Sequence, residues 1–167
     1  GHQDRKFDYM ITNPPFGVSW KADEDFVKNE AKDLNGIFGA GLPRISDGSL
    51  LFLQHLIHKM ETKGSRIGIV LNGSPLFTGD AGSGESEIRK HIVEKDLLET
   101  IIMLPDRLFF NTGITTYLWI LDNKKKKSRE GKIQLINAKD LYKFTKVKLG
   151  EKNKEVSDEQ ILQIMDI

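Results

Sequence analysis

The order of apolar and polar residues divides the chain into short strands and longer helices. Five apolar-rich runs have the length typical of strands: residues 6–12, 66–71, 98–104, 115–121 and 132–138. Apolar side chains recur at three- and four-residue spacing in two further segments, 49–63 and 85–94, which predicts helices there. A weaker helical pattern covers residues 24–34, and residues 157–167 have the pattern of an amphipathic helix.

Strands that alternate with helices imply right-handed crossovers and a mainly parallel sheet, so the pattern predicts an α/β fold. The two strands at 115–121 and 132–138 follow each other without a helix between them. We expect them to form an antiparallel hairpin, joined by residues 123–131. The stretch from residue 17 to 48 is polar, rich in glycine and too long for a simple connection.

Composition narrows the class of protein. With 167 residues, 38% hydrophobic and 29% charged, the chain fits one globular domain, and it has no cysteine for disulfide, metal or nucleophile chemistry. No apolar run is long enough to span a membrane, so we expect no membrane partner and a cytoplasmic location. The net charge of +1 conceals an asymmetry, because residues 124–154 hold twelve Lys and Arg and far fewer acidic residues. That basic segment is either a solvated face or a surface for phosphates.

The most specific local signal is the tetrad Asn13, Pro14, Pro15 and Phe16, directly after the first strand. As a structural feature it is a rigid turn, since consecutive prolines end the strand. Its position also suits a ligand, because ligands of open α/β sheets bind beyond the carboxyl ends of strands.

The residue types fit one particular chemistry. An aromatic amine is a poor nucleophile, but the Asn13 amide oxygen and the Pro14 carbonyl can each accept one of its two N–H groups. Two such acceptors favour the positive charge that develops when the nitrogen attacks a methyl group. Phe16 offers a stacking face for a base rotated out of its helix. Asn is no general base, so its role is positioning and electrostatics.

Residues 7–17, which include this tetrad, resemble the catalytic motif of the S-adenosylmethionine-dependent adenine-N6 DNA methyltransferases. More narrowly, they resemble the methylation subunit of type I restriction–modification systems. Residues 47–55, 66–77 and 104–114 are similar to later motifs of that family, in the family's order. The resemblance implies a three-layer, Rossmann-like methyltransferase fold and a DNA adenine-N6 methyltransferase that acts with a specificity subunit and a restriction/translocase subunit.

The resemblance also implies roles for residues. Asn13, Pro14, Pro15 and Phe16 correspond to the catalytic motif, and Asn13 also contacts the cofactor, S-adenosylmethionine. Phe110 is expected to form a wall of the base pocket, with Phe109 packed inward. Trp20, in the long segment that begins beyond the tetrad, is expected to contact the substrate, although this segment could equally be ordered by a partner subunit. We expect no metal site.

One departure from the family is large. Its glycine-rich cofactor motif precedes the catalytic tetrad, whereas only twelve residues precede Asn13 here. The glycine clusters at 39–41 and 79–84 come too late in the order, and the second could hold an anion only as the start of a helix. We therefore expect residues 1–140 to be the catalytic part of a methyltransferase domain whose N-terminal part is missing, and residues 141–167 to be a tail. On this view the isolated piece is inactive.

Two alternatives remain open at this point. Similar tetrads serve the methylation of RNA bases and of a glutamine side-chain amide, since each substrate presents a planar NH2 group. The chain could also be a non-catalytic nucleic-acid-binding module that keeps the fold.

Overall fold

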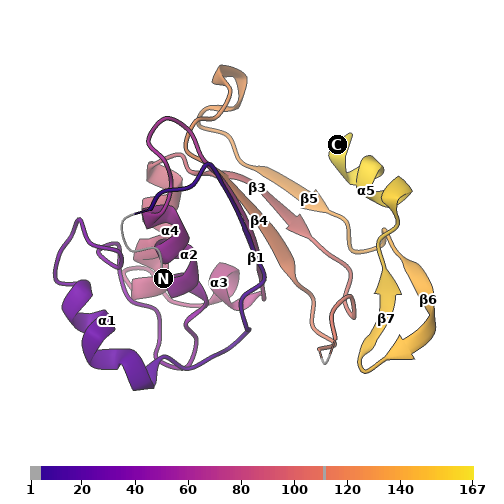
Figure 1. Ribbon diagram of the computed structural model, residues 1–167, viewed down its shortest axis with the longest axis horizontal. Coiled ribbons are helices and arrows are strands. Elements are labelled where there is room, and N and C mark those ends of the chain that lie inside the picture. The colour runs from indigo at the N-terminus through magenta and orange to yellow at the C-terminus, as the bar shows by residue number, and fades with distance from the viewer. Residues whose placement is uncertain (1–4, 111) are drawn as a thin grey trace.

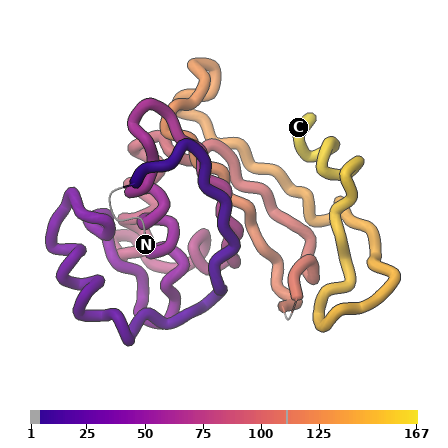
Figure 2. Tube along the Cα trace, in the orientation of Figure 1, coloured from indigo at the N-terminus to yellow at the C-terminus, as the bar shows by residue number. Residues whose placement is uncertain are grey.

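The computed structural model describes residues 5–110 and 112–167, so Asn111 of the later motif lies outside the described residues. Its helices and strands follow one another along the chain as shown in Figures 1 and 2. Their bounds are β1 (Tyr9–Thr12), the 3-10 turn η1 (Lys21–Asp23), α1 (Glu24–Glu30), α2 (Ser49–His58), β2 (Arg66–Leu71), α3 (Ser74–Phe77), α4 (Gly84–Glu94), β3 (Leu98–Met103), β4 (Tyr117–Asp122), η2 (Lys127–Arg129), β5 (Gln134–Asn137), β6 (Lys143–Leu149), β7 (Lys152–Glu155) and α5 (Asp158–Met165).

The main sheet has the strand order β1-β2-β4-β3-β5. β1 runs parallel to β2, and β3 runs parallel to β5. β4 lies between β2 and β3 and is antiparallel to both. The other four strands therefore share one direction, as predicted for an α/β fold with a mostly parallel sheet.

The predicted hairpin between residues 115–121 and 132–138 is wrong. β4 does not pair with β5; β5 pairs with β3 instead. The reason lies in the connection between them, which is tied to β3 and its preceding turn: Arg129 forms an ion pair with Glu99 at 3.0 Å, and Lys125 forms one with Asp96 at 2.6 Å. These contacts carry the chain past β3 to its far side. A C-terminal antiparallel hairpin does exist, but β6 and β7 form it.

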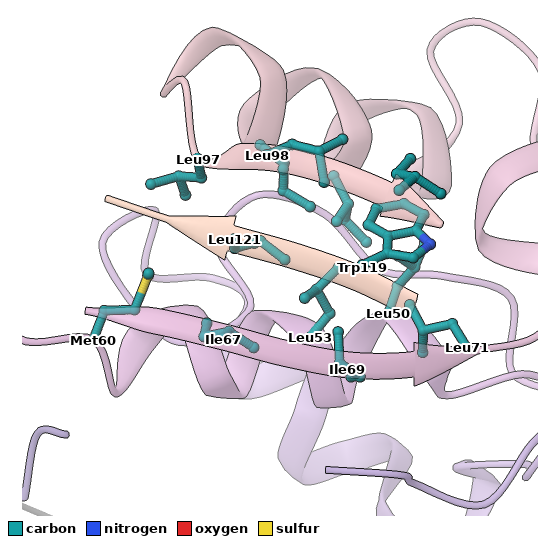
Figure 3. Close-up of a cluster of buried hydrophobic side chains, with 13 residues drawn as sticks. Leu50, Leu53, Met60, Ile67, Ile69, Leu71, Leu97, Leu98, Trp119 and Leu121 are labelled. Carbon is teal, nitrogen blue, oxygen red and sulfur yellow. The ribbon is translucent and has the colours of Figure 1, made fainter. Parts of the chain in front are cut away.

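The core lies on the face of the sheet that α2 and α4 cover (Figure 3). Leu53 of α2, Ile69 of β2 and Trp119 of β4 are at most 1% exposed, and Ile88 and Ile92 of α4 pack into the same cluster. Burying a side chain of this size stabilises the fold by about 1.5–3 kcal/mol. The alternation along β2, with Ile67, Ile69 and Leu71 inward, explains why this strand could be predicted from its pattern.

The opposite face of the sheet is covered only at its margin by the described residues. Ile164, Met165 and Ile167 at the C-terminal end border a hollow of about 780 Å³, together with sheet residues such as Gly68 and Ile120. Figure 1 shows α5 on this side of the sheet, away from α2 and α4. On β1, one of the two edge strands, Ile11 remains 91% exposed.

Several element boundaries differ from the sequence pattern. α2 ends at His58 rather than near residue 63, because the chain bends so that Met60 forms a bridge with Phe7 and enters the core. The predicted amphipathic helix at 157–167 is confirmed as α5, where Ser157 and Gln160 form a capping box. Within the described ranges, no helix combines the length and the hydropathy needed to cross a membrane.

Candidate active site

Three connections of the main sheet meet at one end of it. β1 and β2 are parallel, so the residues that follow them, Asn13 and Asn72, lie at the same edge. β3 has the same direction as β2, and β4 returns antiparallel, so residues 104–110 and 112–116 between them also lie at this edge. Residues far apart in the sequence are thereby placed around one pocket, where ligands of such sheets are expected.

The pocket at this edge has a volume of about 540 Å³. Its lining consists of the whole tetrad with the residue after it, the residue after β2, and aromatic and aliphatic residues of the β3–β4 connection: Asn13, Pro14, Pro15, Phe16, Gly17, Asn72, Phe109, Phe110, Thr112 and Ile114. The structure thus brings the predicted catalytic residues together with the predicted base-pocket residue Phe110.

The tetrad leaves its polar groups available to a ligand. Pro14 is buried and fixes the turn, whereas Asn13 is exposed. Across residues 5–110 and 112–167, neither the Asn13 side-chain amide nor the Pro14 carbonyl forms a hydrogen bond. Gly17 follows with φ of +62°, a conformation that glycine adopts without strain, and it also lines the pocket. Two hydrogen-bond acceptors that have no partner among the described residues therefore lie at the carboxyl end of β1.

Aromatic rings border these acceptors. Phe16 is half-buried, Phe110 is 61% exposed, and both line the pocket. Phe109, which was expected to pack inward, is half-buried and also lines the pocket. The Lys152 ammonium lies 5.5 Å from the centroid of the Phe110 ring. A flat ligand can therefore find ring surface next to hydrogen-bond acceptors.

Trp20, which was predicted to contact the substrate, is buried and lies outside the lining of the pocket. Trp20 is only 7% exposed and packs in a second apolar cluster with Val27, Phe38 and Leu51. Its indole N–H donates to the Arg44 carbonyl at 2.9 Å. A side chain that is enclosed and hydrogen-bonded in this way stabilises the 17–48 segment and is absent from the pocket lining.

Asn72 is the pocket residue that sequence reasoning missed. Its side-chain oxygen accepts the N–H of Ser74 at 3.1 Å, which shapes the start of α3. Within the described part of the chain its side-chain NH2 has no acceptor, so this donor is available to a ligand. Its position after β2 matches that of Asn13 after β1, and this shared position was the signal that could have identified it.

Comparison with known proteins decides the family. The sequence model of the N-6 DNA methylases matches residues 1–167, the whole chain. The chain belongs to the N-6 DNA methylase family. It is 32% identical over 165 residues to the type I restriction enzyme MjaIX methylase subunit of Methanocaldococcus jannaschii, covering 98% of this chain and 28% of that protein. This N-6 DNA methylase chain therefore spans little more than a quarter of that relative.

Solved structures agree on the fold. The type I restriction–modification methyltransferase subunit from Streptococcus thermophilus superposes with a TM-score of 0.79 at 27% identity, over 98% of this chain and 32% of that one. A Listeria monocytogenes protein assigned to the class I S-adenosylmethionine-dependent methyltransferases gives a TM-score of 0.56 at 19% identity, over 81% of this chain and 38% of that one. The N-6 DNA methylase chain has the α/β fold of the S-adenosylmethionine-dependent methyltransferases.

That fold implies S-adenosylmethionine, and the described residues can be tested for a place to hold it. Each glycine cluster has members that are closely packed. A Cβ on Gly84, the first residue of α4, would lie 1.7 Å from the Leu42 carbonyl oxygen, and a Cβ on Gly41 would lie 2.9 Å from the Gly84 carbonyl oxygen. The amino end of α4 is thus covered by the 41–42 backbone and is closed to an anion. The described residues fit the methyl-accepting side of a site, but they do not form a complete cofactor site.

Two charged groups near the pocket pair with each other. Asp106, at the start of the β3–β4 connection, forms an ion pair with Lys154, and the hydrogen bond from Lys154 lowers the pKa of this carboxyl. The same hydrogen bond raises the pKa of the Lys154 ammonium. Among the residues that the structure describes, no three His, Asp or Glu side chains are grouped to hold a metal ion.

Proposed function

We propose that this N-6 DNA methylase is a site-specific DNA adenine-N6 methyltransferase, which transfers the methyl group of S-adenosylmethionine to the exocyclic amine of an adenine flipped out of duplex DNA. The observation that carries this proposal is the pair of unclaimed acceptors on Asn13 and Pro14, in a pocket bordered by Phe16 and Phe110. An amine with two N–H groups on a flat ring matches this arrangement in both hydrogen bonding and shape.

The chain's own residues account for the acceptor half of the reaction. The Asn13 amide oxygen and the Pro14 carbonyl accept the two amine N–H groups and orient the nitrogen lone pair away from the ring plane. As the nitrogen forms its new bond it gains positive charge, which these two oxygen dipoles stabilise more strongly than they stabilise the neutral amine. No side chain of the tetrad is a base, so the extra proton leaves to solvent after the transfer.

The aromatic residues hold the base in place. Phe16 and Phe110 offer ring faces on which adenine can stack, and the energy of stacking offsets part of the cost of removing the base from the duplex. S-adenosylmethionine, when bound, supplies a methyl group attached to a positively charged sulfur. Of the described residues, Asn13 is the one we propose to lie against this cofactor, because it directly follows β1 at the pocket.

The relatives extend the proposal to an assembly. The M. jannaschii and S. thermophilus proteins are described as methylase or methyltransferase subunits of type I systems. We propose that this protein likewise methylates DNA at a sequence chosen by a specificity subunit, and that a restriction/translocase subunit completes the system. A cytoplasmic location is expected on the same basis.

The substrate class can be tested directly. The complete methylase, purified with its specificity subunit, is incubated with S-adenosylmethionine carrying a tritiated methyl group and, separately, with genomic DNA, total RNA and a protein extract. We expect label in DNA, recovered as N6-methyldeoxyadenosine after nuclease digestion. Label confined to RNA would support a base methyltransferase of another class, and label confined to glutamine amides would support a protein methyltransferase. Either result would contradict the proposed function.

A further inference from the structure

The β6–β7 hairpin is fastened to the connection that carries the pocket's aromatic residues. The backbone N–H groups of Asn153 and Lys154 both donate to the Arg107 carbonyl, at 3.2 and 3.3 Å. The Lys154 ammonium pairs with Asp106 and lies 3.9 Å from the centroid of the Tyr142 ring. Figure 1 shows the hairpin beside the β3–β4 connection at the site end of the sheet. The hairpin therefore extends the wall of the pocket outward.

Lysines on this hairpin lack partners. Lys146 and Lys148 of β6 are exposed, and Lys152 of β7 contacts only the Phe110 ring, at 5.5 Å. Within residues 5–110 and 112–167, none of these three ammonium groups pairs with a carboxylate. By contrast, Lys125 and Lys154, elsewhere in the same basic segment, are engaged in ion pairs. The described part of the hairpin thus carries three unpaired cations, and one of them, Lys152, lies against a ring that lines the pocket.

The composition of the hairpin suits a nucleic-acid strand. Residues 143–155 contain five lysines and two glutamates. Phe144 is 68% exposed, and its ring stacks edge-on against Tyr142 at a centroid distance of 5.3 Å. Positive charge interleaved with exposed aromatic rings is the usual makeup of surfaces that follow a single nucleic-acid strand.

The covalent bonds of a DNA strand explain why a positively charged surface is expected beside the pocket. A base that enters the pocket remains bonded to its own strand, so the phosphates on either side of it must lie at the pocket mouth. Lys152 lies next to Phe110 at that mouth, and Lys146 and Lys148 are exposed on β6, the strand that pairs with β7. An uncharged or acidic rim would leave those phosphates without counter-charge.

We propose that the β6–β7 hairpin is the surface that contacts the phosphates of the DNA strand delivering the target adenine, through Lys146, Lys148 and Lys152. This inference rests on the proposed function and adds the surface that holds the strand. Contacts of this kind position the substrate and carry no sequence information. The hairpin therefore contributes affinity and register, while the choice of sequence belongs elsewhere.

The test compares two triple variants of the complete methylase complex: Lys146→Gln/Lys148→Gln/Lys152→Gln and, as the matched control, Lys124→Gln/Lys126→Gln/Lys127→Gln. The control removes the same charge from the connection after β4, which ends at the opposite edge of the sheet. Binding of a fluorescent 30-base-pair duplex that contains a site methylated by the unmodified complex is measured by anisotropy, without cofactor, over a series of NaCl concentrations. Thermal unfolding of each variant checks that it is folded.

Each phosphate contact contributes about 0.9 to the slope of log K against log salt concentration, so the hairpin variant should lose roughly 2.7 from this slope. The control should lose far less. An unchanged slope in the hairpin variant, or equal losses in both variants, would overturn the hairpin surface. If the unmodified complex methylates DNA while the slope is unchanged, only the hairpin proposal fails. If it does not methylate DNA, the proposed function itself fails. Loss of complex assembly with an unchanged slope would assign the hairpin to a protein partner instead.

Discussion

The close contact between Gly84 and Leu42 yields the sharpest prediction about how the helical layer is held. An alanine Cβ at position 84 would lie 1.7 Å from the Leu42 carbonyl oxygen and 2.6 Å from its carbon, both of which are backbone atoms that cannot rotate away. The two backbones must separate until this contact exceeds 3.0 Å, the shortest that real Cβ atoms show. Gly84→Ala should therefore displace residues 41–44 from the start of α4.

The size of the effect follows from the hydrogen bonds that this displacement disturbs. The Gln54 side-chain NH2 donates to the Gly41 carbonyl at 3.0 Å, and the Arg44 backbone N–H donates to the Glu85 carboxylate at 2.9 Å. Gln54 and Glu85 are buried, so each lost bond costs about 1–3 kcal/mol. Alanine recovers about 0.5–1 kcal/mol relative to glycine in a helix. We expect a net loss of about 2–4 kcal/mol in the free energy of unfolding.

Urea unfolding followed by tryptophan fluorescence measures this loss, because Trp20 and Trp119 are both buried. With a slope of about 2 kcal/mol per molar urea, the midpoint should fall by roughly 1–2 M. Gly113→Ala is the control, since its Cβ would meet nothing closer than Glu151 Oε2 at 3.7 Å. Equal midpoints for Gly84→Ala and the unmodified protein would refute the close packing and would reopen the amino end of α4 as an anion site.

Three further predictions concern the pocket, the second cluster and pH. Asn72→Asp keeps the oxygen that accepts the Ser74 N–H but removes the NH2 donor. Because we expect this donor to hold the substrate, Asn72→Asp and Asn72→Ala should both lower kcat/KM by about tenfold or more. Full activity of Asn72→Asp would show that the side chain only shapes the turn before α3. Trp20→Phe should lower the free energy of unfolding by about 1–2 kcal/mol and leave the KM for DNA unchanged, whereas a raised KM would restore Trp20 to the substrate surface. Burial lowers the pKa of His55, His58 and His91, so the unfolded state binds protons first as the pH falls below about 6.5. The urea midpoint should therefore be lower at pH 5.5 than at pH 7.5, and an equal or higher midpoint would contradict this.

The parts of the fold that could be predicted from the sequence are those set by local pattern. β2 alternates buried and half-buried residues, and α4 places Ile88 and Ile92 four apart on its inner side. The tetrad could be placed because two prolines end β1 wherever the rest of the chain goes. These features depend on residues that are neighbours in the sequence, so the pattern contains the information.

Features set by distant contacts could not be predicted. The insertion of β4 between β2 and β3 depends on Trp119 fitting against both neighbours and on the Arg129–Glu99 ion pair, which joins residues thirty apart. The burial of Trp20 depends on Phe38 and Leu51, on separate segments. A glycine-rich, polar sequence around an aromatic residue indicates an exposed loop when only neighbours are considered, and tertiary packing overrides that indication.

The pocket itself was predicted in part. Asn13, Pro14 and Phe16 could be placed together from the tetrad, and Phe110 from the resemblance to a later motif. Asn72 follows β2 as Asn13 follows β1, yet its place in the pocket becomes visible only once the two strands are known to be parallel neighbours. The hairpin beside Phe110 lies in the segment whose fold the sequence left open.

The central claim is that the Asn13 amide oxygen stabilises the developing charge on an adenine amine. The most direct measurement is the initial rate of N6-methyldeoxyadenosine formation by the complete methylase on DNA, quantified by mass spectrometry, for the unmodified protein and for Asn13→Ala. Removing one such electrostatic partner costs about 100- to 1000-fold in rate, so we predict a loss of at least this size in kcat with DNA binding retained. A variant that forms N6-methyldeoxyadenosine at the unmodified rate would contradict the account.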